Sequence, residues 1–334
     1  MNEYLKIFID KDYPSFIDKY LNTKTLNRIK KIGQFCGCDY TKIYSPLFFY
    51  SRFDHSLVVA HMTWHFTHDK LPTIAALLHD IGTPCFAHTI DVLLGDAINQ
   101  ESSEIDIIEL IKKDTELLDC LKKDNISLDD LKDLSKYSIL ENKSPKLCTD
   151  RLDGVLHTCY IWLHTHKLEN IKEVYENISI LTNEEGYQEL GFTNLAISKK
   201  FAKMVLVYSL ELQSNRNKFV MKYISDALNK AFTENLFTIN DLYEKSENKI
   251  VNILNKNISS WNIFINSSNV SKTNIKLNQY HINFETKKRT VIPLLNQNNK
   301  ITRINKISTI EPIYKKITNF NDKKYAYIKD IKEI

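Results

Sequence analysis

Glycine and proline are both scarce in this chain, and their scarcity constrains the fold more than any other feature of the sequence. Each accounts for 7 of the 334 residues, against a usual share of roughly 7% for glycine and 5% for proline. A Gly-rich nucleotide-binding fold, a many-turned all-β sandwich and a disordered chain all need more of these residues. Hydrophobic residues make up 43% of the chain. The sequence therefore predicts a mainly α-helical protein with a substantial core.

Charge and cysteine usage exclude several broad classes of protein. The 45 basic and 41 acidic residues leave a net charge of +4, which is too balanced to indicate nucleic acid binding but permits an anionic substrate. No run approaches the ~20 apolar residues of a membrane span, and the first residues do not resemble a secretion signal. Six cysteines in a chain of this length are not a disulfide framework. We expect a cytoplasmic protein with reduced thiols and no membrane partner; nucleic acid binding stays open.

Hydrophobic periodicity predicts a series of helices over the first three quarters of the chain. The expected helical stretches are residues 19–32, 54–68, 72–81, several short helices in 100–140, then 144–164 and three helices in 193–255. Pro72 suits a first helical turn, and Gly82 suits the residue just past a helix end. Residues 41–51 are expected to form a loop with a short extended piece, because Pro46 interrupts the pattern.

The pattern changes after residue 257. Between residues 258 and 304 the chain is rich in Asn and Ser, and apolar residues alternate with polar ones, which predicts strands. A short helix at 311–320 and an extended piece at 324–330 are expected to follow. Because no linker separates two domains, we predict one helical unit with a smaller C-terminal α+β part packed on it.

Acidic and histidine side chains interrupt three apolar helices in a way that suggests a metal site. The pair His79-Asp80 ends one apolar helix, and a charged Asp there is costly to bury unless it is paired or bound to a metal. Arg52 to His55 opens another helix, and Thr149 to Asp153 begins a third. Two imidazoles and two carboxylates from these helices would form a mixed N/O site for a divalent ion. The alternative is an ordinary core histidine beside an aspartate at a helix end.

At this point the sequence resembles a known family. The segments RFDHSLVVAH, AALLHDIGTPCFAH and TDRLDGVLH resemble the HD-domain metal-dependent phosphohydrolases, and in particular the deoxynucleoside triphosphate triphosphohydrolase branch. The resemblance is strongest over about residues 50–160. It implies an HD-type helical phosphohydrolase domain over residues 1–255, with its core at 50–210, and a strand-containing segment over 256–334. It also implies a homodimer or larger assembly.

The resemblance implies roles for particular residues. The metal ligands would be His55, His79, Asp80 and Asp150, holding Mn, Fe, Ni or Mg. Arg52 matches an arginine that contacts the substrate phosphate, a role that suits a guanidinium beside a metal. His88 matches a histidine near the scissile phosphate, where it would orient water or protonate a leaving oxygen.

The chain departs from the family pattern around the metal ligands. Thr83 and Asn99 stand where the branch has histidines, while Gly154 and Thr158 stand where it has a tyrosine and an acid that read the deoxyribose. Gly154 and Thr158 are therefore candidate substrate-binding positions with altered chemistry. We expect hydrolysis of a nucleotide or related phosphate compound by metal-activated attack of water. The alternative is a nucleotide-binding regulatory or signalling protein that keeps the metal site but has little turnover.

Other features are weaker candidates for function. His61, His65 and His68 share one helix face; they could hold a second metal, but burial beside the main site is favoured. His157 lies on the Asp150 helix and could reach the pocket. The Cys36-Gly37-Cys38 segment has no second cysteine pair, which favours structural thiols. The basic run at residues 287–289 is most simply a solvated strand end or turn, although it could bind an anionic effector.

Overall fold

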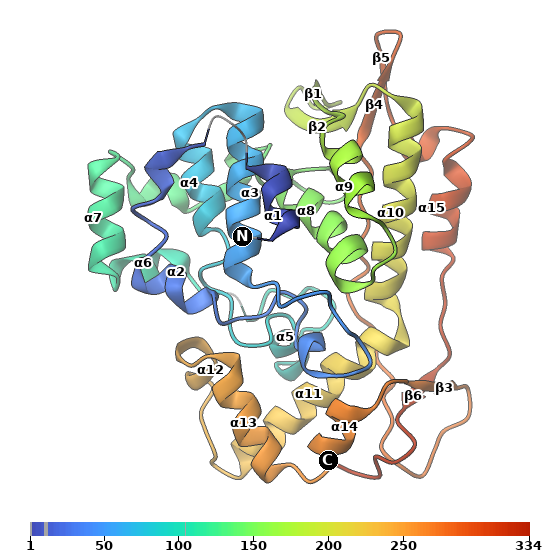
Figure 1. Ribbon diagram of the computed structural model, residues 1–334. Helices are drawn as coiled ribbons and strands as arrows, with labels where there is room; N and C mark the ends of the chain where they lie inside the picture. The colour runs from blue at the N-terminus through green and yellow to red at the C-terminus, as the bar shows by residue number, and fades with distance from the viewer. Residues whose placement is uncertain (1, 10–12, 104) are drawn as a thin grey trace.

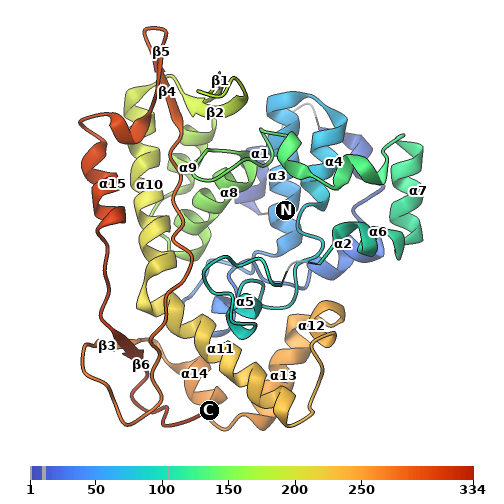
Figure 2. The ribbon, with the colours of Figure 1, turned by 180° about the vertical axis from the view of Figure 1, so that it is seen from behind.

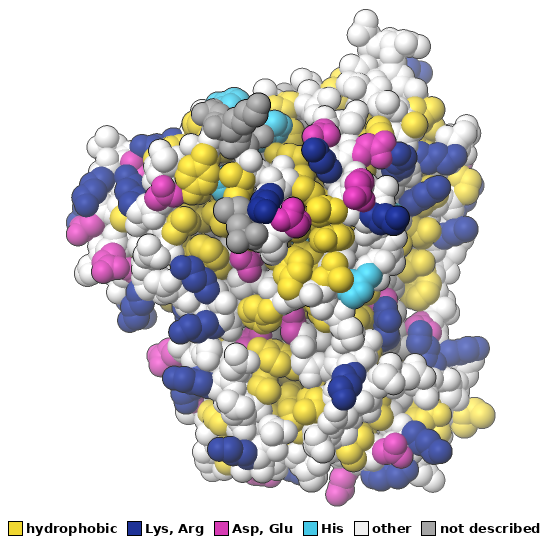
Figure 3. All heavy atoms as spheres, viewed as in Figure 1, with side chains coloured by type: hydrophobic (Ala, Val, Ile, Leu, Met, Phe, Trp, Pro, Cys, Tyr) yellow, Lys and Arg dark blue, Asp and Glu magenta, His cyan; other side chains and the backbone are white. Residues whose placement is uncertain are grey.

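The computed structural model describes residues 2–9, 13–103 and 105–334 and is mainly helical, with two small sheets (Figure 1). The predicted fold class is confirmed: the helices dominate, and short strands occur in the C-terminal part. Within the described ranges, no helix combines the length and the apolar character needed to cross a membrane. On the face drawn in Figure 3, basic and acidic side chains are interspersed.

The first half of the chain builds a group of helices around α3 and α4, which pack side by side (Figure 1). The helices are α1 (Glu3–Phe8), α2 (Lys24–Ile29), α3 (Arg52–Thr67), α4 (Lys70–Leu78), α5 (Thr89–Leu93), α6 (Ile107–Lys112), α7 (Thr115–Lys123), α8 (Thr149–His157) and α9 (Leu168–Tyr175). Short 3-10 turns occupy Ser15–Ile17, Cys38–Tyr40, Leu128–Leu131 and Leu134–Lys136, and a π-helical turn at Thr158–Trp162 extends α8.

Helix α3 begins at Arg52, two residues before the expected start, because Ser51 and Asp54 cap it. The Ser51 side chain accepts a hydrogen bond from the Asp54 amide at 3.1 Å, and the Asp54 carboxylate accepts one from the Ser51 amide at 2.9 Å, a reciprocal cap that stops the helix from fraying. Val58 faces one hydrophobic cluster and Val59 the other, so α3 is buried on two sides. A helix buried in this way also carries its polar residues, including His55, into the interior.

Three of the expected helices differ at their ends. The stretch at 19–32 is helical only at Lys24–Ile29, and the one at 144–164 begins at Thr149. Helix α4 has Pro72 in its first turn as predicted, but ends at Leu78, so Gly82 is not its C-terminal cap. Gly82 serves a different need: a Cβ there would lie 3.0 Å from the Ile105 carbonyl oxygen, a tight contact that would push this backbone segment away.

The second half of the chain adds two long helices and the sheets. Its helices are α10 (Leu195–Gln213), α11 (Asn215–Thr233), α12 (Asp241–Glu244), α13 (Glu247–Asn257), α14 (Trp261–Asn266) and α15 (Glu311–Thr318), with a 3-10 turn at Ile304–Lys306. Its strands are β1 (Ile178–Thr182), β2 (Gln188–Phe192), β3 (Ser271–Thr273), β4 (Leu294–Gln297), β5 (Lys300–Arg303) and β6 (Tyr325–Tyr327). The larger sheet has the order β1-β2-β4-β5, and β3 pairs with β6.

The expectation of strands over residues 258–304 was right for β3, β4 and β5 and wrong for the rest of the range. Helix α14 lies in this range, and most of residues 274–293 form no strand (Figure 2). The alternating pattern has another cause: Ile282 and Val291 are buried against the rest of the chain while the backbone runs extended. The β1–β2 hairpin was missed, although β2 pairs with β4 in parallel and so joins the C-terminal part to the rest. The helix at 311–320 and the extended piece at 324–330 match α15 and β6.

Candidate metal centre

Four donor atoms from three helices converge at the centre of the helical group. His55 lies in the first turn of α3, His79 and Asp80 directly follow α4, and Asp150 lies in the first turn of α8. His55 Nε2 lies 3.0 Å from Asp150 Oδ1 and 3.9 Å from Asp80 Oδ2. His79 Nε2 lies 3.7 Å from each of the same two oxygens. The structure thus brings together all four residues that the sequence singled out.

Each imidazole is held with its Nε2 toward the other donors. His55 Nδ1 donates to Asp153 Oδ2 at 2.6 Å, and His79 Nδ1 donates to the Ala76 carbonyl at 2.7 Å; both partners can only accept. His79 Nε2 is buried and has no hydrogen-bond partner among the described residues. His79 thus has one nitrogen fixed by an acceptor and the other left open, which is typical of metal-binding histidines. His55 Nε2 instead contacts Asp150 Oδ1 at 3.0 Å.

The Asp80 and Asp150 carboxylates favour positively charged groups around them. Although burial opposes its ionisation, the Arg52 guanidinium and the neighbouring imidazoles hold the pKa of Asp80 below its usual range. Burial also opposes the imidazolium form of His55, but hydrogen bonds to Asp150 and Asp153 raise its pKa to about 10. In the chain alone, protons supply the positive charge that the carboxylates favour. A divalent cation between the same atoms would supply that charge instead.

The donor set and its spacing fit a divalent ion. Donors bound to one ion at about 2.1 Å lie about 3 Å apart when adjacent and about 4 Å apart when opposite, and the four separations above fall within this range. Two nitrogens and two carboxylate oxygens suit Mn, Fe, Ni or Mg. Cys148 has its sulfur near Asp150, but burial raises the pKa of the thiol, which makes it a poor ligand.

Asp153 supports the candidate metal site through its hydrogen bond to His55. Its carboxylate is fully buried and accepts hydrogen bonds from His55, from the Tyr50 hydroxyl at 3.0 Å and from the Tyr4 hydroxyl. Sequence analysis included Asp153 among the acids of the third helix but gave it no role, and it missed both tyrosines. The signal was present: Asp153 follows Asp150 by three residues, so both lie on neighbouring parts of one helix face.

Arg52 is buried beside the donors and donates from Nη1 to Asp80 Oδ2 at 2.9 Å. This is the only side-chain hydrogen bond of Arg52 within the described parts of the chain. Asp80, a candidate metal ligand, therefore holds the Arg52 guanidinium in place, and the other N–H groups of the guanidinium remain able to donate. The Thr83 hydroxyl donates to the other oxygen of Asp80 at 3.2 Å, so this carboxylate is oriented from two sides.

His88 lies between Asp91 and Arg289, and the sequence suggested neither contact. Its Nδ1 donates to the fully buried Asp91 carboxylate at 3.0 Å, and its Nε2 accepts a hydrogen bond from Arg289 Nη2 at 3.2 Å. Burial, with the charges of Arg289 and Arg52, lowers the pKa of His88 to about 4. Arg289 also donates to Gln100 at 2.7 Å. The simplest interpretation of the basic run, a solvated strand end or turn, is therefore wrong for Arg289.

The positions that depart from the family pattern fall in different surroundings. A Cβ added to Gly154 would meet no atom within 4 Å, so a side chain has room there. Thr158 is buried, and its hydroxyl donates to the Gly154 carbonyl at 2.8 Å within its own helix. Asn99 is exposed. Gly154 thus has open space beside it, whereas the Thr158 hydroxyl is already used.

Of the weaker candidates from the sequence, His157 lies beside the metal centre, whereas His61 packs against a tyrosine. His157 is buried, and one of its ring nitrogens lies near a ring nitrogen of His55 and a carboxylate oxygen of Asp153. Burial lowers the pKa of His157 to about 4. Among the described residues, His61 and its two neighbours on that helix face join no such donor group; His61 packs against Tyr13, with ring centroids 5.3 Å apart. All six cysteines are free thiols.

Asp39 and Glu247 form a second buried acidic pair, and they lead to a prediction about pH. Burial, then the charge of Glu247, raises the pKa of Asp39 to about 8, and burial raises that of Glu247 to about 7. The unfolded chain releases these protons near pH 4. Stability should therefore fall as pH rises from about 4 to 8 and level off above, and Asp39→Asn should flatten this fall, gaining about 2 kcal/mol over wild type at pH 8.5.

Urea unfolding of both proteins between pH 5 and 9 measures the difference. Asp119→Asn is the matched control, because the Asp119 side chain is 65% exposed. An Asp39→Asn protein whose stability changes with pH as steeply as that of the wild type would contradict the prediction.

Comparisons with known proteins identify relatives but no named activity. No family model matches the chain. The uncharacterized protein YdhJ of Bacillus subtilis (strain 168) is 24% identical over 205 residues, which is 61% of this chain and 61% of the length of that relative. A crystal structure of a hypothetical protein from Aquifex aeolicus matches with a TM-score of 0.62 over 93% of this chain and 91% of that one, at 16% identity. The second likeness shows a shared fold.

Proposed function

We propose that this chain is a metal-dependent phosphohydrolase of the HD-domain type that acts on a nucleotide or a related phosphate compound. The observation that carries the proposal is the convergence of the four donor atoms: each of the two imidazole Nε2 atoms lies 3.0–3.9 Å from the Asp80 and Asp150 oxygens, and both imidazoles are oriented by acceptors at Nδ1. The buried Arg52 guanidinium beside them supports a phosphate as the group that is bound.

The residues around the site have separate tasks in this proposal. A divalent ion, when bound, would lower the pKa of a water ligand and polarise the phosphoryl group. Arg52 binds a phosphate oxygen with the donors that Asp80 leaves free. His88 is neutral, and its Nε2, which accepts the hydrogen bond from Arg289, has no proton to donate, so its task here is to hold the Arg289 guanidinium. Arg289, which contacts that nitrogen, adds positive charge on the same side.

One observation favours the alternative of a nucleotide-binding regulatory protein. His88 Nε2 is occupied by Arg289 and has a lowered pKa, so the protein lacks a ready proton donor at this position. With Thr83 in place of a second histidine, turnover could be slow while nucleotide binding persists. The intact donor set favours the hydrolase.

The experiment that separates the two is a substrate panel. Purified protein loaded with Mn²⁺ is incubated with nucleoside mono- and triphosphates, cyclic dinucleotides and short oligonucleotides, and the products are separated by ion-exchange chromatography. Hydrolysis that a chelator abolishes supports the phosphohydrolase. Saturable nucleotide binding without any product supports the regulatory protein, and neither binding nor hydrolysis contradicts both.

The open space at Gly154 predicts weak discrimination between ribose and deoxyribose. A site that makes no hydrogen bond to a sugar hydroxyl rejects its variants poorly, so kcat/KM for dGTP and GTP should agree within about tenfold. Gly154→Tyr should shift the ratio toward dGTP, since the added ring has room to enter. Gly154→Ala is the control and should leave the ratio unchanged. Strong exclusion of GTP by the wild type would show that other residues read the sugar.

A further inference from the structure

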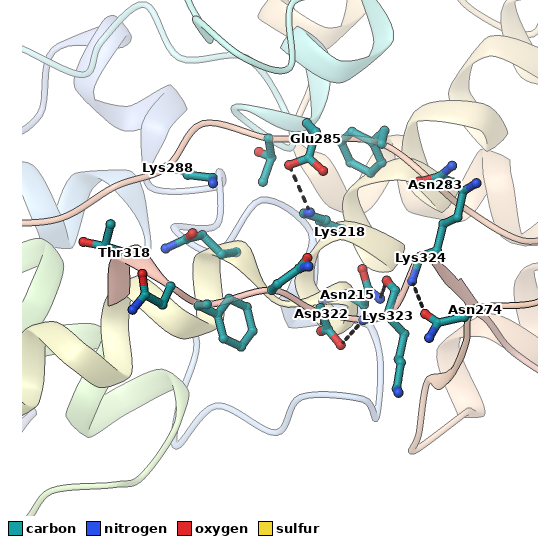
Figure 4. Close-up of a pocket in the computed structure, with 16 residues that line it drawn as sticks. Asn215, Lys218, Asn274, Asn283, Glu285, Lys288, Thr318, Asp322, Lys323 and Lys324 are labelled. Carbon is teal, nitrogen blue, oxygen red and sulfur yellow. Dashed lines mark hydrogen bonds and ion pairs between the residues drawn. The ribbon is translucent and has the colours of Figure 1, made fainter. Parts of the chain in front are cut away.

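A polar cavity of about 690 Å³ is lined by residues from the second half of the chain, and Figure 4 shows it in close-up. Its walls come from the junction of α10 and α11, from residues 283–288, from residues 318–324 and from Asn274. None of the 16 residues that line it is a candidate metal ligand. An inference about this cavity therefore does not rest on the proposed function.

Lys218 places a positive charge in this cavity without a hydrogen bond to any described residue. The residue is only 9% exposed, yet within the described part of the chain its ammonium makes no hydrogen bond. The acidic group facing it in Figure 4 is Glu285, whose Oε2 lies 3.8 Å away, beyond hydrogen-bond distance. The Glu285 side chain is 75% exposed, so water weakens the attraction. The Lys218 ammonium therefore has no close acceptor among the described residues, and an anion in the cavity can supply one.

The other acid in the cavity cannot neutralise Lys218. Asp322 accepts hydrogen bonds from the Asn215 amide at 2.8 Å and from Lys272 Nζ at 2.7 Å, so its Oδ2 is already engaged. The lining as a whole contains four lysines against two acidic residues. The cavity therefore has an excess of two positive charges, of which the most enclosed lies on Lys218.

We propose that this cavity binds a small phosphate monoester, whose dianionic phosphate accepts the hydrogen bond from the Lys218 ammonium that the long ion pair with Glu285, at 3.8 Å, does not supply. A phosphate dianion matches the excess charge of the lining, and lysine binds phosphate as a point charge. Six side-chain amides and two phenylalanine rings complete the walls. They offer hydrogen bonds and an apolar face to the sugar or nucleoside that carries the phosphate.

Isothermal titration calorimetry in the presence of EDTA tests the proposal, because the chelator removes any contribution from a metal centre. The probes are inorganic phosphate, glucose 6-phosphate and AMP, which separate the phosphate from the body that carries it. Wild-type protein should bind at least one ester saturably, and Lys218→Met should weaken binding at least tenfold. Lys222→Met is the matched control; it lies one turn further along α11, pairs with Asp226 and is absent from the lining, so binding should change less than twofold.

A second variant keeps the test decisive if Lys218→Met does not fold. Glu285→Gln removes the carboxylate that competes with the ligand, from a side chain that is largely exposed, so affinity should rise severalfold. No saturable binding of any probe by the wild type would overturn the proposal. So would unchanged affinity in a folded Lys218→Met protein, or weaker binding in Glu285→Gln.

Discussion

Asp80→Ala and Asp150→Ala should each lose the bound divalent ion while the chain stays folded. Each substitution removes one of two carboxylates that face the paired imidazoles, and a site left with one carboxylate and two nitrogens holds a hard or borderline ion far less tightly. Elemental analysis of protein purified with Mn²⁺ should give about one equivalent for the wild type and less than a tenth for either variant. Any phosphohydrolase activity should fall at least a thousandfold.

The control for this experiment is Asp119→Ala, which removes an exposed acid on α7. Its metal content and activity should equal those of the wild type. Circular dichroism separates loss of metal from loss of fold. A full equivalent of metal in both Asp80→Ala and Asp150→Ala would show that these carboxylates do not hold the ion.

Substitutions at Asp153 should have a large effect on stability and a separate effect on metal affinity. Asp153→Ala leaves three buried donors, on His55, Tyr4 and Tyr50, without their acceptor. Breaking a buried charged network in this way costs about 3–5 kcal/mol. Urea unfolding in the presence of EDTA measures this cost without a contribution from bound metal.

Asp153→Asn tests the support that Asp153 gives to His55. The amide keeps the shape but removes the charge behind His55, and loss of such a partner typically weakens metal binding about 10- to 100-fold. Tyr4→Phe is the matched control, since it removes one hydrogen bond and leaves the carboxylate. It should cost about 1 kcal/mol and change Mn²⁺ affinity little. Equal metal affinity in Asp153→Asn and wild type would separate Asp153 from the metal centre.

The sequence predicted the helical elements well where local signals were strong. The apolar pattern of residues 54–68, and Pro72 in a first turn, act through neighbouring residues, so α3 and α4 were recognisable. The strand prediction failed for residues 274–293 because an alternating pattern of apolar and polar residues indicates only which side chains are buried. Whether the partner of an extended segment is another strand or a helix surface depends on residues far away in the chain.

The four candidate ligands could be named from the sequence because their residue types are costly to bury without a partner, and because their order resembles that of a known family. The amino-acid sequence by itself determined that the chain is mainly helical and which polar side chains enter its interior. Only the tertiary structure decided what those side chains meet: Asp153 behind His55, Arg289 against His88, and Lys218 in a cavity without a close acceptor. Such contacts join residues 98 or more positions apart, or surfaces formed by several segments. Hydrogen bonds and charge pairs of this kind depend on distances that only the packed chain sets.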